Sequence, residues 1–214
     1  MRVIVGRTQH ELDRVALEAR VAPYRRLVLD VGTGGGRAVL GTAAVEPDAL
    51  VVGIDADAAS MVDASRRAAA SAPRGGRPNA LFVVGAAEEL PGPFEGLVDE
   101  ATVRFPWGSL LRGAVGGAGP VSAGLASLLR LGGTLLLLVA LKPKDGFDDL
   151  LPLVVEPPLL AERLGAVYAR LGLRLDECRL ATSAEIAEAH SSWARRLRVG
   201  RDRSAVIARL VRPV

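Results

Sequence analysis

The segment 27–36 constrains the fold of this chain more than any other. An apolar run there leads through an acid, Asp30, into a turn in which four of five residues are glycine. Glycine is needed where a backbone turns tightly or a ligand approaches it closely, because a Cβ atom would collide. The pattern therefore predicts a buried strand, a tight turn and a helix, with a ligand crevice at the carboxyl end of the strand.

Short apolar runs alternate with helical stretches along the rest of the chain, which is typical of βαβ units and a parallel sheet. The 214 residues are enough for one α/β domain and too few for two ordinary ones. We therefore expect a single domain over 1–214, with an N-terminal hairpin extension at 1–11 and a seven-stranded, mostly parallel sheet with helices on both faces. Strands are predicted at 27–31, 50–54, 80–84, 100–105, 134–141, 173–180 and 205–211, and helices at 12–20, 37–45, 58–72, 110–115, 121–129, 159–171 and 184–189.

Composition excludes several classes of protein. Hydrophobic residues make up 50% of the chain, so a full core can be buried. The longest apolar run, 135–141, is far too short to cross a bilayer, and no signal-peptide pattern is evident at the N-terminus. The lone cysteine, Cys178, has no disulfide partner, and no Cys/His set has metal-ligand spacing. We expect a cytoplasmic, monomeric protein without a metal and without membrane association.

Acidic residues follow the next two predicted strands. Asp55 ends the second strand, where a carboxylate can accept both hydroxyls of an adenosine ribose. The third strand opens into small residues followed by Glu88, which would leave room for an adenine ring. A dinucleotide fingerprint would need a glycine where Arg37 stands, and a P-loop lysine is absent. Acids at three consecutive strand ends therefore predict a cofactor that contains adenosine.

Two tryptophans stand beside predicted strand ends. Trp107 follows the fourth strand in a Pro-aromatic pair, at the place where amino-methyltransferases often carry an Asn/Asp-Pro-Pro-aromatic loop that stacks on the target base. The polar first residue of that loop is missing here. Trp193 begins a basic end, 193–214, that contains seven arginines and a single acid, while the rest of the chain is slightly acidic. This asymmetry favours a polyanionic partner, with a solvated arginine-rich surface as the alternative; each tryptophan taken singly could equally be a core or interface residue.

Three motifs together carry a family resemblance: 30–36, the Phe-Pro-Trp-Gly-Ser-Leu-Leu run at 105–111, and Ser192-Trp193 with the arginines after it. The chain closely resembles, over nearly its whole length, the aminoglycoside-resistance 16S rRNA (adenine(1408)-N(1))-methyltransferases of the Kam/Npm type. The resemblance implies a class I, Rossmann-like methyltransferase that uses S-adenosylmethionine to methylate N1 of adenine 1408 in the 30S subunit. The partner it implies is the decoding site of 16S rRNA, and the biological effect is resistance to aminoglycosides.

The resemblance also implies three sets of site residues. The cofactor would be held by Asp30, Gly32, Thr33, Gly34, Asp55, Ala87, Glu88, Arg104, Phe105, Pro106 and Ser109. Asp30 would meet the methionine amino group, and the loop 104–109 would close over the methionine end. The flipped adenine would lie between Trp107 and Trp193, with Ser191 or Ser192 supporting that pocket. The rRNA backbone would be bound by Arg66, Arg67, Arg74, Arg77, Arg196, Arg201 and Arg203, the last three in a basic linker at 193–203.

Two departures from the family pattern matter. Arg104 stands where an apolar residue is expected beside the cofactor, so its contact could be through the backbone only. Ala70 and Ser71 stand where relatives tend to have lysines. The sequence leaves two alternatives open: a class I methyltransferase acting on another RNA, such as tRNA, or on a small molecule, and a non-catalytic RNA-binding or cofactor-sensing module on the same fold.

Overall fold

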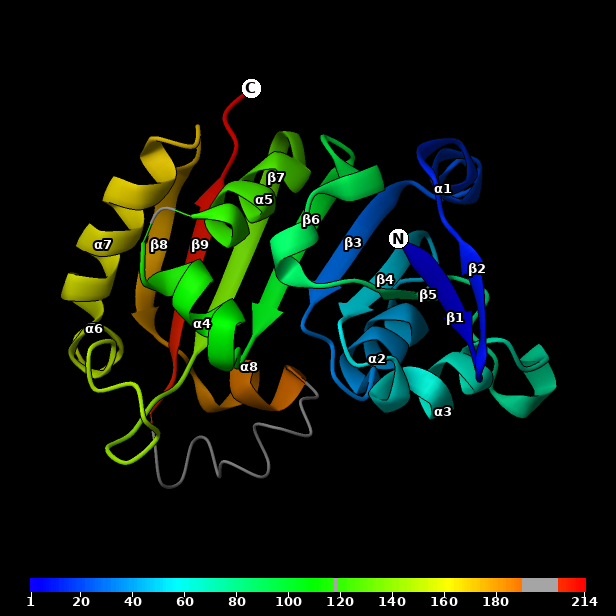
Figure 1. Cartoon of the computed structure of the whole chain (residues 1–214), viewed down its shortest axis with the longest axis horizontal. Coiled ribbons are helices and arrows are strands. Elements are labelled where there is room, and N and C mark those ends of the chain that lie inside the picture. Colours follow the sequence, from blue (N-terminus) through cyan, green and yellow to red (C-terminus); the bar gives the residue numbers. More distant parts are fainter. Residues whose placement is uncertain (118, 190–203) are drawn as a thin grey trace.

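The computed structural model describes residues 1–117, 119–189 and 204–214. Its strands form one sheet in the order β2-β1-β5-β4-β3-β6-β7-β9-β8, which runs across the molecule from the N-terminal hairpin to β8 (Figure 1). The strands are β1 Arg2–Val5, β2 Thr8–Glu11, β3 Arg26–Val31, β4 Ala49–Asp55, β5 Ala80–Val84, β6 Val98–Arg104, β7 Leu129–Val139, β8 Arg174–Leu180 and β9 Val206–Val211. The helices are α1 Arg14–Val21, α2 Arg37–Val45, α3 Ala58–Ala68, α4 Gly108–Val115, α5 Pro120–Leu128, α6 Leu151–Val155, α7 Pro157–Ala169 and α8 Ser183–Glu188.

The centre of the sheet is parallel. β3 pairs in parallel with β4 on one side and with β6 on the other, and β5 and β7 extend the two halves. β9 is antiparallel to both β7 and β8. The strand order therefore reverses between β3 and β6, which is where an open α/β sheet has its ligand crevice beyond the carboxyl ends of the strands.

Buried side chains alternate between the two faces of the sheet, as the period of a strand requires. In β3, Leu27 and Leu29 pack into the larger core beneath α1, α4, α5 and α7, while Val28 between them packs against α2 and α3. β4 and β5 repeat this alternation. Tyr168 of α7, fully buried in the larger core, donates its hydroxyl to the carbonyl oxygen of Ala114, and burial raises its pKa. The expected mostly parallel sheet with helices on both faces is confirmed.

Several boundaries differ from the sequence predictions. α3 ends at Ala68 instead of continuing to residue 72, and a short 3₁₀ turn at Ala72–Arg74 follows, because Pro73 cannot continue a helix. β7 begins at Leu129, earlier than the predicted 134, because Leu129 pairs with Val98 ahead of a register shift. The short helix α6 has no counterpart among the predicted helices.

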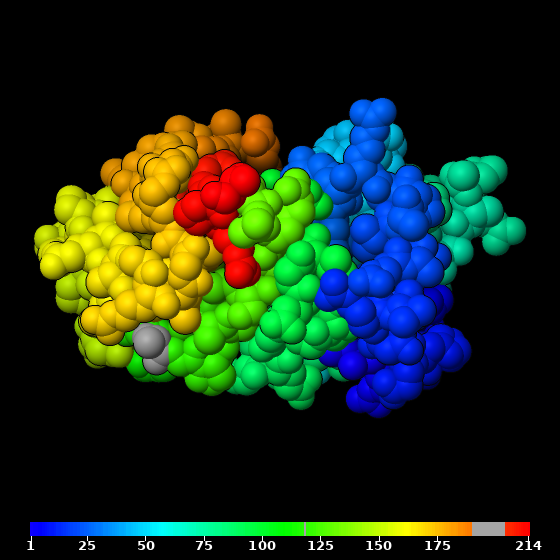
Figure 2. All heavy atoms as spheres, turned by 90° about the horizontal axis from the view of Figure 1, so that it is seen from above, coloured from blue at the N-terminus to red at the C-terminus, as the bar shows by residue number. Residues whose placement is uncertain are grey.

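The N-terminal hairpin is part of the main sheet. β1 pairs antiparallel with β2 and also with the edge of β5, so the hairpin lengthens the sheet beside the third parallel strand. The last residues of the chain lie on the surface in Figure 2. They are flanked there by the segment that precedes β8 and by the segment around the start of β7. Across the described residues, no helix combines the length and apolarity needed to span a bilayer.

Candidate functional site

A cavity of about 760 Å³ opens at the carboxyl ends of β3, β4, β5 and β6. This volume lies within the usual range for small-molecule and cofactor sites. All eleven residues that the sequence assigned to the cofactor line it, and Trp107 joins them. The structure therefore brings together side chains from four strand ends, although their roles remain predictions.

The glycine turn after β3 is held in place by the end of β4. The backbone N–H groups of Gly32 and Thr33 both donate to the carbonyl oxygen of Ile54, at 2.8 and 3.0 Å. Gly32 has φ +76°, and a Cβ atom there would lie 2.5 Å from Leu110 of α4. The absence of a side chain thus lets α4 close over the turn at the cavity wall.

Asp55 connects the glycine turn to α3. One carboxylate oxygen accepts from the N–H of Gly34 at 2.7 Å, and the other accepts from the N–H of Asp57 at 2.9 Å. Each carboxylate oxygen has two lone pairs, so both can still accept a hydroxyl from the cavity. Asp55 can therefore shape the turn and bind the two hydroxyls of a ribose at the same time.

The Thr33 hydroxyl points away from the other polar groups of the described residues. Thr33 lines the cavity, but its hydroxyl oxygen is buried beside Gly53 without a hydrogen-bond partner among the described residues. A Cβ atom at Gly53 would lie within 3.0 Å of the Thr33 side chain, so that glycine provides the space for it.

An ion pair lies at the floor of the cavity. Nη1 of Arg104, at the end of β6, is 2.8 Å from Oδ1 of Asp30 on the neighbouring strand β3. The hydroxyl of the fully buried Thr102 also donates to Oδ1, at 2.8 Å. The Arg104 side chain pairs with the carboxylate of Asp30 and Arg104 lines the cavity, so a contact with the cofactor is open to its side chain as well as to its backbone.

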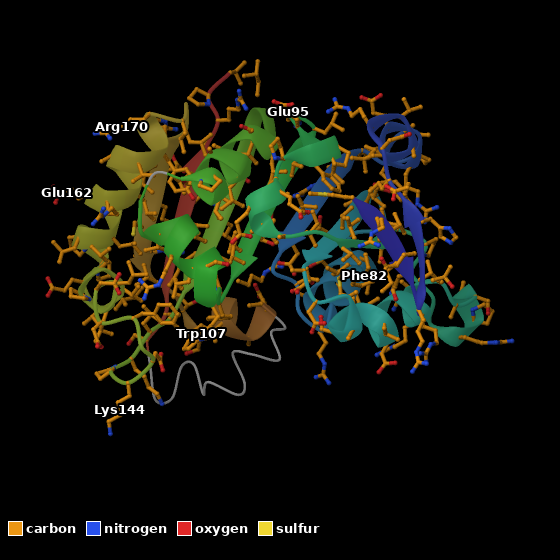
Figure 3. All side chains as sticks on the ribbon, viewed as in Figure 1. Phe82, Glu95, Trp107, Lys144, Glu162 and Arg170 are labelled. Carbon is orange, nitrogen blue, oxygen red and sulfur yellow. The ribbon has the colours of Figure 1, made fainter. Side chains whose placement is uncertain are left out.

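The loop after β6 turns sharply before Trp107. Phe105 has φ +50°, which is uncommon for a residue with a side chain, and strain of this kind tends to occur at functional sites. Its ring is buried in a small core with Leu138 and Ile207, and its N–H donates to the carbonyl oxygen of Leu138. This arrangement fixes the backbone just before Trp107, whose side chain is 37% exposed. Figure 3 shows Trp107 at the opposite edge of the molecule from Glu95 and Arg170.

Phe147 supports Trp107 from a segment far away in sequence. The two rings meet edge to face, with centroids 4.9 Å apart and an angle of 86°. The guanidinium of Arg112 lies over the ring of Phe147, 5.0 Å from its centroid, and forms a 2.7 Å ion pair with Asp149. Sequence reasoning missed Phe147 because nothing at 142–150 marks it as a neighbour of α4.

Changing Phe147 should therefore disturb the orientation of Trp107 while the rest of the cavity stays intact. We expect Phe147→Leu to lower the methyl transfer that the resemblance implies by roughly threefold to tenfold, because an edge-to-face aromatic pair contributes about 0.5–1.5 kcal/mol. Steady-state kinetics would show the loss, with unchanged cofactor affinity. Phe147→Tyr keeps the ring and should restore most of the activity; equal losses in both variants would contradict this role.

Four of the predicted RNA-binding arginines lie within the described residues, and they differ in exposure. Arg66 and Arg67 on α3 and Arg74 in the following turn are exposed, although Arg66 also lies 3.6 Å from Asp63. Arg77 is half-buried, and its guanidinium donates to the carbonyl oxygens of its own loop, so its role is at least partly structural. The other predicted residues lie outside the described residues: Ser191, Ser192, Trp193, Arg196, Arg201 and Arg203.

The cavity also has lining residues that sequence reasoning did not single out. Ser60 in the first turn of α3 donates its hydroxyl to the carbonyl oxygen of Gly34, at 3.0 Å. The sequence could have indicated Ser60 as a lining residue, because it lies shortly after Asp55. Ala189 reaches the cavity from the end of α8, and only the tertiary structure could show that.

This sheet order, with a cavity at its switch point, defines a class I methyltransferase fold. A family described as 16S rRNA (adenine(1408)-N(1))-methyltransferase matches residues 2–212. The chain belongs to this family.

Individual relatives agree with that assignment. A 16S rRNA (adenine(1408)-N(1))-methyltransferase of Streptoalloteichus hindustanus is 38% identical over 213 residues, which cover 97% of each chain. The crystal structure of the 16S rRNA methyltransferase KamB superposes with a TM-score of 0.89 at 35% identity, over 100% of both chains. A mutant of the Catenulisporales acidiphilia enzyme, solved with its cosubstrate SAM, has a TM-score of 0.84 at 30% identity, over 100% of this chain and 97% of that one. The aminoglycoside resistance methyltransferase NpmB1 is 32% identical, with a TM-score of 0.79 over 99% and 98% of the two chains.

Proposed function

We propose that this protein transfers a methyl group from S-adenosylmethionine to N1 of adenine 1408 in 16S rRNA and so confers resistance to aminoglycosides. Membership of the family supports the reaction, and its relatives include a named resistance enzyme. The observation that carries the proposal is the cavity itself. Three acids that follow consecutive strands line it together with the exposed Trp107, which supports a site for the cofactor and the target base.

The cavity fits S-adenosylmethionine in shape and chemistry. Asp55 can accept the ribose hydroxyls, and the small residues Gly85, Ala86 and Ala87 leave room for an adenine ring with Glu88 near its edge. Asp30, at the end of β3, is the acid for the methionine ammonium. When bound, the cofactor supplies an electrophilic methyl group on a sulfonium.

The target nitrogen needs no general base. N1 of adenine carries an in-plane lone pair that is free at neutral pH, so no proton must leave before attack. The protein's task is to place N1 in line with the methyl group, and orientation of this kind can lower a barrier by about 7–11 kcal/mol. We therefore assign no acid–base residue.

Presenting the base is the harder task. Flipping a base out of its stack costs a few kcal/mol, whereas stacking on an aromatic ring contributes about 1–3 kcal/mol. Two rings on opposite faces of the adenine can offset the extrusion, and one ring cannot. We propose that Trp107 supplies one ring and that Trp193, outside the described residues, supplies the other.

The exposed arginines of α3 and the turn after it support an rRNA-binding surface. We expect Arg67→Glu to weaken binding to the 30S subunit and to reduce the slope of log affinity against log salt, because each phosphate contact releases counterions. Arg170→Glu, on an exposed position at the end of α7 away from Trp107, is the matched control (Figure 3). Identical salt slopes for the two variants would show that Arg67 does not contact phosphate.

The reaction is tested by supplying methyl-labelled S-adenosylmethionine with assembled 30S subunits, naked 16S rRNA, tRNA or buffer. We expect label in the 30S sample and a primer-extension stop at adenine 1408, because N1 methylation blocks the Watson–Crick edge. Bacteria that express the protein should grow in kanamycin and apramycin. Label on tRNA alone would favour another RNA as substrate, and no label on any sample would favour a binding module.

A further inference from the structure

The ion pair between Asp30 and Arg104 leaves some hydrogen-bonding groups of both side chains without a partner among the described residues. The side chains are 5% and 16% exposed, so both charges are largely withdrawn from water. A buried ion pair is not by itself a stabilising feature, because its desolvation cost can exceed the attraction between the charges. Its presence on the floor of a ligand cavity therefore calls for a functional reason.

The polar atoms of this pair are only partly satisfied. A guanidinium has five N–H donors, and within the described residues Arg104 uses Nη1 alone, toward Asp30. On Asp30, both hydrogen bonds end on Oδ1, and Oδ2 accepts none from the described part of the chain. None of these remaining atoms is among the fully buried, unpaired side-chain atoms of the described residues, and both residues line the cavity, so the remaining donors and acceptor are available to a ligand with complementary groups.

The methionine end of S-adenosylmethionine has that complementarity. It carries an ammonium and a carboxylate on the same carbon atom, so the groups that recognise them must be neighbours. Asp30 and Arg104 are such neighbours, with oppositely charged groups 2.8 Å apart. Resting on the proposed function, we propose that the Arg104 guanidinium binds the carboxylate of S-adenosylmethionine while Asp30 binds its ammonium.

This assignment gives Arg104 a selective role. A guanidinium pairs with a carboxylate through directed, charge-assisted hydrogen bonds, which an apolar residue at this position could not form. The protein should therefore distinguish S-adenosylmethionine from its decarboxylated form, which keeps the ammonium and the sulfonium. A purely structural Arg104, which only neutralises Asp30, would give no such discrimination.

The test is calorimetric binding of three compounds to the whole protein: S-adenosylmethionine, decarboxylated S-adenosylmethionine and 5′-methylthioadenosine, which lacks the amino-acid end. We expect the wild type to prefer the first over the second by roughly tenfold to a hundredfold. Arg104→Met should abolish this preference by weakening S-adenosylmethionine, while decarboxylated S-adenosylmethionine, whose ammonium no longer competes with the guanidinium for Asp30, should bind at least as tightly as to the wild type. Arg104→Lys should restore part of the preference.

Asp30→Asn is the matched control, because it removes the ammonium partner and should weaken both amine-bearing compounds while preserving their ratio. Equal weakening of both by Arg104→Met, or no preference in the wild type, would overturn the proposal. A wild type without the preference overturns the proposal even if Arg104→Met does not fold, and Arg104→Lys then serves as the variant that assigns the contact to this side chain. A wild type that binds none of the three compounds would instead refute the proposed function.

Discussion

Replacing Trp107 with alanine is expected to lower methylation of the 30S subunit severely while the protein still binds S-adenosylmethionine. The ring is 37% exposed at the cavity, supported by Phe147, and it follows a turn fixed by Phe105. Removing it forfeits about 1–3 kcal/mol of stacking and with it the alignment of the base. We expect kcat/KM to fall by about a hundredfold or more, measured with labelled cofactor.

The control for this prediction is Trp107→Phe, which keeps an aromatic face of smaller area. It should retain part of the activity, and calorimetry should give the same cofactor affinity for wild type and both variants. Normal turnover by Trp107→Ala would remove this ring from the base-binding site. Loss of cofactor affinity in that variant would mean that the ring serves the cofactor and not the base.

Gly36→Ala is expected to produce a large loss of stability, although Gly36 does not line the cavity. Its φ is +68°, and a Cβ atom would lie 2.4 Å from the ring of Phe82 and 2.7 Å from the Cβ of Ala64, both buried. The left-handed backbone costs about 1–2 kcal/mol for a residue with a side chain, and overpacking a core adds about 1–3 kcal/mol. Chemical denaturation should show a free energy of unfolding lower by about 2–5 kcal/mol.

Gly96→Ala separates the two contributions to that loss. Gly96 has nearly the same φ, +65°, but no atom of the described residues lies within 4 Å of the position that its Cβ would take. This variant should therefore lose only the backbone part, about 1–2 kcal/mol. Equal losses at the two positions would show that Phe82 moves away freely and that the packing at the start of α2 is loose.

The sequence by itself determined the order of the strands, the order of the helices apart from α6, and the acids at the strand ends. The continuous apolar run of β3 and the glycines after it are local properties, because strand formation and positive φ are set by neighbouring residues. Since the ends of parallel strands meet at one edge of a sheet, the sequence alone was enough to place Asp30 and Asp55 at one cavity. The family resemblance then supplied the expected substrate.

Only the tertiary structure decided which side chains meet between those elements. The Arg104 guanidinium turns to Asp30, Phe147 supports Trp107 and Leu110 covers Gly32, and each of these contacts joins residues from different segments. The hairpin likewise continues the sheet because β5 offers it an unpaired edge. Such contacts depend on how whole helices and strands pack against one another, and the spacing of residues in the sequence does not predict that packing.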